Sequence, residues 1–174
     1  MVVKRPTLFS HPLQALYKHP THTSPPNGVS IPVLDIIIVN WNAGHQLRDC
    51  LESIMAAKRD GFFLDRVVVV DNASTDSSLC LSGSLKVPLV LIRNTANRGF
   101  GAACNQGADG SRADYLLFLN PDTCLFTESL SKPVQFMEHH PGGKHTGICG
   151  VQLVNDKGEV SRSCSRFPTV LSYY

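Results

Sequence analysis

The sequence predicts an α/β fold with three layers, in which helices cover both faces of a mostly parallel, Rossmann-like β-sheet. Several short runs are almost entirely apolar, which is typical of strands buried on both faces. Helical patterns separate these runs, and a chain that alternates between strands and helices builds a parallel sheet. The 174 residues suffice for one domain with a sizeable core and hardly for two.

The expected strands and helices follow one another along the sequence. The first apolar run, 33–39, is nearly continuous, and the helix after it places Leu47, Leu51, Ile54 and Met55 on one face. The remaining strands are expected at 66–70, 88–92 and 115–119, and the remaining helices at 102–108 and 129–139.

Residues 1–31 are expected to form a flexible leader, and residues 32–174 the folded domain. The leader is rich in proline and has no sustained periodicity. It has no continuous apolar segment, so it is neither a signal peptide nor a membrane anchor, and no stretch approaches the ~20 apolar residues of a spanning helix. Its basic residues either contact anionic lipid or belong to a solvated tail. We therefore expect a cytoplasmic protein, with peripheral contact at the inner face of the cell membrane as the further option.

Charge and cysteine content exclude some classes of function. The formal net charge of +2 gives no indication of nucleic-acid binding. The six cysteines are widely spaced and form no C-x-x-C pair, so we interpret them as reduced thiols rather than as disulfides or zinc ligands.

Polar clusters follow each of the four expected strands. They lie at residues 40–42, 71–76, 94–101 and 120–122. In open parallel sheets, ligands bind beyond the carboxyl ends of the strands, where the strand order reverses. The four clusters therefore predict a single functional cleft.

Two of these clusters suggest ligand contacts, each with a structural alternative. Asp71 can accept hydrogen bonds from a nucleobase or a ribose, or it can form a turn with Asn72 while Ser74 caps the next helix. Gly99 and Gly101 allow the backbone to approach an anion at the start of a helix, with Arg98 either at the ligand or in solvent. The dinucleotide pattern G-x-G-x-x-G is absent, which disfavours a nicotinamide enzyme.

The fourth cluster suggests a cation site. Asp122, just past a buried strand, can coordinate Mg²⁺ or Mn²⁺ that bridges two phosphates, although Pro121 and Asp122 also suit a turn. Trp41 either stacks on a base or belongs to the core.

Taken together, four segments resemble glycosyltransferase family 2, and most closely its bacterial rhamnosyltransferase-like branch. The resemblance runs from about Leu34 to Thr169 and rests on residues 36–42, 69–76, 97–107 and 117–122. It implies the GT-A fold and transfer with inversion at the anomeric carbon.

The resemblance also implies a role for each cluster. Residues 40–42 lie beside the base, Asp71 contacts the base or ribose, and Arg98 with its glycine neighbours lines the donor site. Asn120-Pro121-Asp122 takes the place of the D-x-D motif, with Asp122 on the divalent cation and Asn120 in the first position. The nucleotide-sugar-binding set is therefore Asn40, Trp41, Asn42, Asp71, Asn72, Asn97, Arg98, Gly99, Gly101, Asn105, Asn120 and Asp122.

By this resemblance the general base lies beyond Tyr174, so we expect a donor domain that is incomplete at its C-terminal end and has little activity alone. Its apolar surface would then favour self-association. The expected function is transfer of a sugar, with rhamnose from dTDP-rhamnose as one candidate, to a polysaccharide or lipid-linked glycan. The alternatives are a non-catalytic binding or interaction module and, more distantly, a nucleotidyltransferase.

Overall fold

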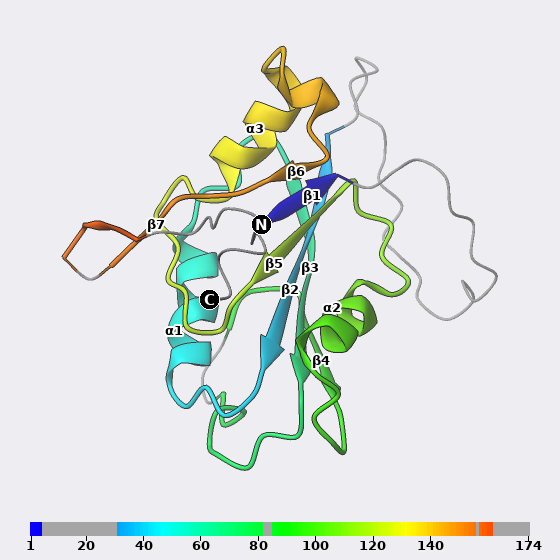
Figure 1. Cartoon of the computed structure of the whole chain (residues 1–174), viewed down its shortest axis with the longest axis vertical. Coiled ribbons are helices and arrows are strands. Elements are labelled where there is room, and N and C mark those ends of the chain that lie inside the picture. The colour runs from blue at the N-terminus through cyan, green and yellow to red at the C-terminus, as the bar shows by residue number, and fades with distance from the viewer. Residues whose placement is uncertain (5–30, 82–84, 156, 162–174) are drawn as a thin grey trace, which may run out of the picture.

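The computed structural model describes residues 1–4, 31–81, 85–155 and 157–161. Figure 1 shows how its elements are arranged. The elements are β1 (Val2–Lys4), β2 (Val33–Asn40), α1 (Gln46–Ala56), β3 (Phe63–Asp71), β4 (Leu89–Arg93), α2 (Phe100–Ala108), β5 (Tyr115–Leu119), α3 (Ser131–His139), the 3-10 helix η1 (Gly143–His145), β6 (Ile148–Cys149), β7 (Leu153–Val154) and β8 (Val160–Ser161).

Six strands form one sheet in the order β4-β3-β2-β5-β1-β6. The four strands from β4 to β5 in this order are parallel, and β1 pairs antiparallel with both β5 and β6. β7 and β8 form a separate antiparallel hairpin. The mostly parallel sheet predicted from the apolar runs is confirmed.

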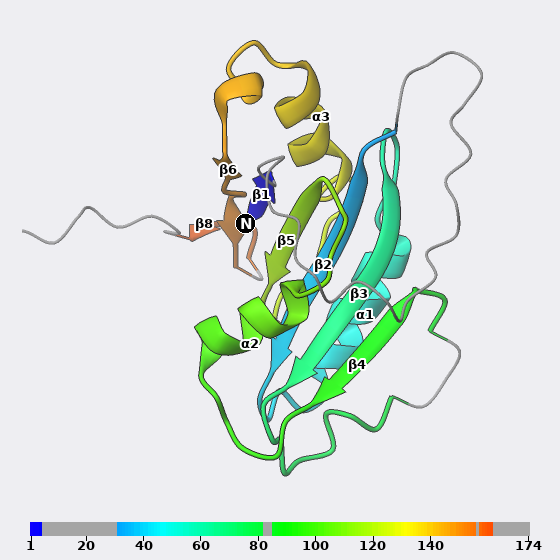
Figure 2. The same ribbon diagram turned by 90° about the vertical axis from the view of Figure 1, so that its right-hand side faces the viewer.

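Helices lie on both faces of this sheet, and Figure 2 shows α1 and α2 on opposite sides of it. Apolar residues of α1 and α3 pack with one face of β2, β3 and β5 in the larger core cluster. Ala103 and Cys104 of α2 pack with the other face, in a smaller cluster that includes Ile37 and Val70. The strands are apolar on both faces because both faces are covered.

Gly107 brings α2 very close to the sheet. A Cβ atom at this position would lie 2.6 Å from Cγ2 of Ile37 and 3.1 Å from Cγ2 of Val70. Real side chains do not tolerate such a separation, so only glycine allows the helix to pack at this depth. The contact fixes the distance of α2 from the strands whose ends carry the polar clusters.

A buried ion pair joins β2 to β3. The Asp35 carboxylate accepts hydrogen bonds through Oδ2 from Nη2 of Arg66 (2.7 Å), Nε of Arg66 (3.1 Å) and Oγ of Ser111 (2.7 Å). Asp35 is fully buried, and its Oδ1 has no hydrogen-bond partner in the described part of the chain. Arg66 therefore neutralises a carboxylate that has no access to water.

The structure corrects two expectations about organisation. Val2–Lys4 form a strand with Val2 in the core, so the flexible leader is wrong for these residues, while residues 5–30 lie outside the described part. The expected capping role of Ser74 is also wrong, because no helix lies between β3 and β4 in residues 72–81 and 85–88. Ser74 Oγ instead accepts hydrogen bonds from Asn40 at the end of β2 and from Asn42 in the loop that follows.

The boundaries of several elements also differ from the prediction. β3 begins at Phe63 and α2 at Phe100, both earlier than expected, and α3 begins at Ser131, later than expected. In the described part of the chain, no helix has both the length and the apolar character needed to cross a membrane.

Candidate functional site

The carboxyl ends of β2, β3, β4 and β5 meet at one edge of the sheet, because these strands are parallel. Asn40, at the end of β2, is the register partner of Asp71 at the end of β3. Asp71 is in turn the partner of Arg93 at the end of β4. The polar clusters that are separate in the sequence are therefore neighbours in the structure (Figure 1).

Asn40 is the centre of a buried network at this edge. Its Nδ2 lies 2.8 Å from Oδ1 of Asp71, 2.9 Å from Oγ of Ser78 and 3.0 Å from Oγ of Ser74. Oδ2 of Asp71 accepts a hydrogen bond from the backbone N–H of Ser74 at 3.2 Å. Asp71 is only 3% exposed. Oδ1 of Asp71 thus joins the ends of β2 and β3, and Oδ2 holds the loop that follows β3.

The loops that follow β2 and β3 are joined by further hydrogen bonds. The Asn42 N–H donates to Oγ of Ser74 at 2.9 Å, and Oδ1 of Asn42 accepts from the Thr75 N–H at 2.8 Å. Oδ2 of Asp76 accepts from the Gly44 N–H at 2.8 Å. The hydroxyl of Ser78 donates to Asp76 and is the main cause of the lowered pKa of that carboxyl. Asp76 therefore joins the loops that follow β2 and β3.

A second network holds the turn that precedes α2. Oδ1 of the buried Asn72 accepts hydrogen bonds from Nδ2 of Asn94 (3.0 Å) and from the Arg98 N–H (3.4 Å), and its Nδ2 donates to the Gly99 carbonyl (3.3 Å). Asn94 and Gln106 exchange two hydrogen bonds of 2.9 Å and 3.0 Å between their side-chain amides. Asn72 thus positions the glycine turn, and Asn94 fastens α2 to the end of β4.

Several members of these networks are missing from the nucleotide-sugar-binding set predicted from the sequence: Gly44, Ser74, Thr75, Asp76, Ser78, Asn94 and Gln106. Asn94 had a usable signal, because it directly follows an apolar strand, as Asn72 does. No sequence signal marked Ser78 or Gln106. Their partners, Asn40 and Asn94, are 38 and 12 positions away in the chain.

The turn before α2 leaves its N-terminal end open. Gly99 has φ +82°, which favours glycine, and its N–H donates to Oδ1 of Asn97 at 2.9 Å. A Cβ atom at Gly101 would meet nothing within 4 Å. The Arg98 and Asn105 side chains are exposed on this surface. The first turn of α2 therefore presents free space beside a flexible cation.

The loop after β5 carries Asn120 and Asp122 and is attached to α1. The Sγ of Cys50 lies 3.7 Å from the Asn120 carbonyl oxygen, and the Leu125 N–H donates to Oγ of Ser53 at 3.0 Å. Burial, together with smaller contributions from the nearby charges of Cys124 and Asp122, raises the pKa of the Cys50 thiol to about 12. The Asp122 carboxylate is therefore close enough to Cys50 on α1 to affect the pKa of its thiol.

Asp122 suits a site that substrate phosphates complete. Its carboxylate is exposed and accepts no hydrogen bond from another described residue. Within the described ranges, no group of three or more histidine, cysteine or acidic side chains could hold a metal ion. Mg²⁺ commonly binds through one or two carboxylates together with substrate phosphates and water, so one free carboxylate at this position is compatible with such an ion.

Two aromatic side chains are exposed around these loops. Trp41 is 59% exposed in the loop after β2, and Phe100 is 58% exposed at the start of α2. The alternative that Trp41 belongs to the core is therefore wrong. Exposed rings beside a polar network provide flat apolar surface for a nucleobase or another ring.

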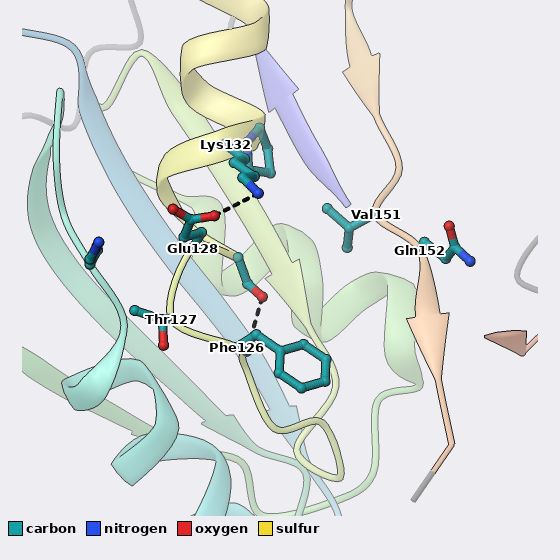
Figure 3. Close-up of a pocket in the computed structure, with 9 residues that line it drawn as sticks. Phe126, Thr127, Glu128, Lys132, Val151 and Gln152 are labelled. Atoms are coloured by element: carbon teal, nitrogen blue, oxygen red, sulfur yellow. Dashed lines mark hydrogen bonds and ion pairs between the residues drawn. The ribbon is translucent and has the colours of Figure 1, made fainter. Parts of the chain in front are cut away.

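A cavity of about 560 Å³ lies apart from the buried networks. Its walls include Phe126 and Glu128 in the loop after β5, Lys132 on α3, and Val151 (Figure 3). None of the predicted nucleotide-sugar-binding residues lines it.

Comparison with known proteins decides the family. The family model described as glycosyl transferase family 2 matches residues 35–163, which is well over half of the chain. The chain belongs to glycosyltransferase family 2. The matched segment contains all four polar clusters, so the strand-end networks are part of this glycosyltransferase domain.

Individual relatives are similar over part of their length. An uncharacterised glycosyltransferase of Haemophilus influenzae is 32% identical over 109 residues, which is 63% of this chain and 36% of the relative. The poly(ribitol-phosphate) beta-glucosyltransferase of Bacillus spizizenii is 28% identical over 127 residues, 67% of this chain and 20% of that protein. The chain thus spans about a third or less of these curated relatives.

Solved structures show the same fold. A mannosyltransferase of Pyrobaculum calidifontis, in complex with GDP-Man and Mn²⁺, matches with a TM-score of 0.56 and 23% identity over 64% of this chain and 34% of that one. Residues 1–349 of S. aureus TarS, in complex with UDP, match with a TM-score of 0.55 and 23% identity over 62% of this chain and 32% of that one. The glycosyltransferase domain therefore has the GT-A fold that was expected.

Proposed function

We propose that this glycosyltransferase domain binds a nucleotide-diphosphate sugar at the strand-end networks, for inverting transfer to a polysaccharide or lipid-linked glycan. The observation that carries the proposal is the position of Asp71. It joins β2 to β3 at the edge where an exposed ring, a glycine turn and an exposed carboxylate also gather. Solved relatives that hold UDP and GDP-Man support the substrate class.

The base and ribose are assigned to the ends of β2 and β3. A carboxylate has about four acceptor positions, and the hydrogen bonds from Asn40 and Ser74 to Asp71 use only part of this capacity. Asp71 therefore retains acceptor capacity for a base N–H or a ribose hydroxyl, while Asn40 and Asn42 keep the surrounding loops in place. Trp41 supplies an exposed ring for the base.

The diphosphate is assigned to the space between α2 and the loop after β5. The open N-terminal end of α2 favours anions, and Gly101 leaves room for a phosphate to approach the backbone. The Arg98 guanidinium supplies positive charge beside Asn97, Gly99 and Asn105. Asp122, with Asn120 beside it, would hold Mn²⁺ or Mg²⁺. When bound, such an ion neutralises the charge that develops on the leaving diphosphate.

Inversion also needs a base that removes the proton from the acceptor hydroxyl. We propose that a segment beyond Tyr174 supplies this base together with part of the acceptor site. The support is that the chain spans only 36% of its Haemophilus influenzae relative. The rhamnosyltransferase-like branch, dTDP-rhamnose as the donor, the cytoplasmic location and self-association stay predictions.

Thermal unfolding with nucleotides tests the proposal. The chain is titrated with dTDP, UDP and GDP, each with and without Mn²⁺. A ligand at a hundredfold excess over its Kd stabilises the folded state by about 2.7 kcal/mol, which gives a readable shift in Tm. We expect one nucleotide to give a Mn²⁺-dependent shift that Asp122→Ala abolishes. No shift with any of the three would overturn the proposal in favour of a non-catalytic module.

A further inference from the structure

The cavity beside α3 has no role in donor binding as proposed above. It lies between the loop after β5, the start of α3 and the segment that precedes β7, and Lys58, just past α1, also lines it. Figure 3 shows Glu128 and Lys132 on one side of the cavity and Val151 and Gln152 on the other. Three segments distant in the sequence therefore build one concave surface.

We propose that this cavity is a subsite for the acceptor and that it takes a sugar or polyol unit bearing a phosphate group. The proposal rests on the function proposed above, because an acceptor subsite has meaning only beside a donor site. Three observations carry it: the charges in the cavity, an exposed aromatic ring on its wall, and the short chain distance to Asp122.

The charges of the cavity favour an anion. Glu128 forms an ion pair with Lys132, one helical turn along the chain. The Lys58 ammonium has no ion-pair partner among the described residues. The hydrogen bond from Lys132 is the main cause of the lowered pKa of the Glu128 carboxyl, and the charge of Lys58 makes a smaller contribution. Two ammonium groups thus face one carboxylate, and the surplus positive charge suits a phosphate, which lysine binds as a point charge.

The apolar part of the cavity suits a ring. Phe126 is 69% exposed, the largest exposed fraction among the described large hydrophobic residues. Val151 lies across the cavity from the loop that carries Phe126 (Figure 3). A ligand site typically combines such apolar walls with a few polar groups that set orientation. The C–H face of a sugar or a polyol chain can cover the ring while its phosphate faces the lysines.

The position of the cavity suits an acceptor. Phe126 follows Asp122 by four residues, so their Cα atoms are at most about 14 Å apart. The loop between them is fixed on α1 by the Leu125 N–H to Ser53 and by the Lys58 N–H, which donates to the Thr127 carbonyl at 2.7 Å. The cavity wall is therefore preformed, within the length of a short oligosaccharide from the proposed phosphate site.

Amide chemical shifts of the ¹⁵N-labelled chain test this subsite directly. The probes are glucose 6-phosphate, glucose and inorganic phosphate. We expect glucose 6-phosphate to move the signals of residues 126–132 and 151–152 and to bind about tenfold more tightly than glucose, because one charge-assisted contact contributes about this factor. Signals that do not move, or that move only at residues 40–42 and 71–76, would overturn the proposal.

Variants separate the two parts of the cavity. Replacing Lys58 and Lys132 by glutamine should remove the preference for glucose 6-phosphate over glucose, and Phe126→Ala should weaken both sugars equally. Lys86→Gln, at an exposed lysine outside the cavity, is the matched control and should change nothing. If Phe126→Ala loses its dispersed spectrum, Phe126→Leu takes its place. Unchanged binding in the glutamine variant would contradict the charge argument.

A parallel nucleotide titration distinguishes failure of this subsite from failure of the proposed function. The cavity variants should bind nucleotide as the unmodified chain does. Nucleotide binding without glucose 6-phosphate binding would overturn the acceptor subsite alone. Glucose 6-phosphate binding without nucleotide binding would overturn the donor site and, with it, the acceptor role of the cavity. Competition by a short glycerol phosphate oligomer would identify a phosphodiester polymer as the source of the phosphate, and competition by vesicles containing polyprenyl phosphate would identify a lipid.

Discussion

Nδ2 of Asn40 donates a hydrogen bond of 2.8 Å to Oδ1 of Asp71, and both side chains are buried at the ends of adjacent parallel strands. The Asn40 side-chain amide has nearly the same shape as the Asp71 carboxylate, and it supplies a hydrogen-bond donor without adding a charge. The Asp71 side chain is thereby held at the edge where the nucleotide is proposed to bind.

Asn40→Asp should test this relationship through its dependence on pH. A second carboxylate beside Asp71 places like charges in a buried site, which raises the pKa of one carboxyl. Because of the raised pKa, Asn40→Asp should be less stable than the parent at pH 7. It should regain stability as the pH falls towards 4, when one carboxyl binds a proton. We expect a loss of about 3–5 kcal/mol in the free energy of unfolding at pH 7. Urea unfolding of variant and parent at pH 7 and pH 4 measures this loss. An equal loss of unfolding free energy at both pH values would contradict the proposed repulsion between the two carboxylates.

Gly107→Ala should destabilise the domain although alanine is the better helix former. The added methyl group would meet Ile37 and Val70 in the core, and overpacking of this kind typically costs about 1–3 kcal/mol. Gly101→Ala is the matched control in the same helix, since its methyl group would enter open space. Urea unfolding should show a loss for the first variant and no loss for the second.

Gly101→Ala should nevertheless weaken nucleotide binding. The protein leaves space at this position, so a lower affinity in a fully stable variant would come from the ligand itself. Isothermal titration with the nucleotide that gives the largest thermal shift measures the effect. Unchanged affinity would show that the diphosphate does not approach the backbone at Gly101.

Arg66→Met should cost about 3–5 kcal/mol of unfolding free energy, because it leaves the buried Asp35 carboxylate without its positive partner. The double variant Asp35→Leu/Arg66→Met removes both charges and should recover most of the loss. Chemical denaturation of the three proteins checks this. A double variant no more stable than Arg66→Met would show that the pair contributes through more than its charge.

Cys50 should resist alkylation in the folded protein. Its pKa is raised to about 12, so almost no thiolate exists at pH 8, and the side chain is buried. Because the folded pKa lies above the unfolded value, this thiol contributes stability below about pH 9 that is lost between about pH 9 and pH 12. Peptide mass spectrometry after iodoacetamide treatment should find Cys80 and Cys124 modified and Cys50 protected until urea is added. Rapid labelling of Cys50 in the folded chain would refute its burial.

The apolar runs of the sequence were enough to predict the four parallel strands, because burial on both faces leaves a continuous signal in β2, β3 and β5. The expected burial of the strand at 88–92 was wrong, since β4 lies at the edge of the sheet and is only partly buried. β1 could not be predicted in this way. Three residues carry no periodicity, and the partners of Val2–Lys4 on β5 lie more than a hundred residues away. The helix expected after Ser74 was wrong because the hydroxyl of Ser74 binds the neighbouring loop instead of capping a helix.

The candidate site was predictable where a residue ends a strand, as Asn40 and Asp71 do. It was not predictable where side chains meet only after folding, as with Ser78 and Gln106. The cavity is the clearest case. Lys58, Phe126 and Val151 come from three segments with no shared pattern, and only the packing of α3 and the later strands brings them together.

The attachment of α2 has a consequence for the cost of binding. Gly107 sets the depth of this helix on the sheet, and the paired amides of Asn94 and Gln106 fasten it to β4. The turn at Gly99 is therefore already ordered before any ligand arrives. A nucleotide that docks here loses little affinity to the ordering of backbone, so the free and occupied forms of this turn should superpose closely.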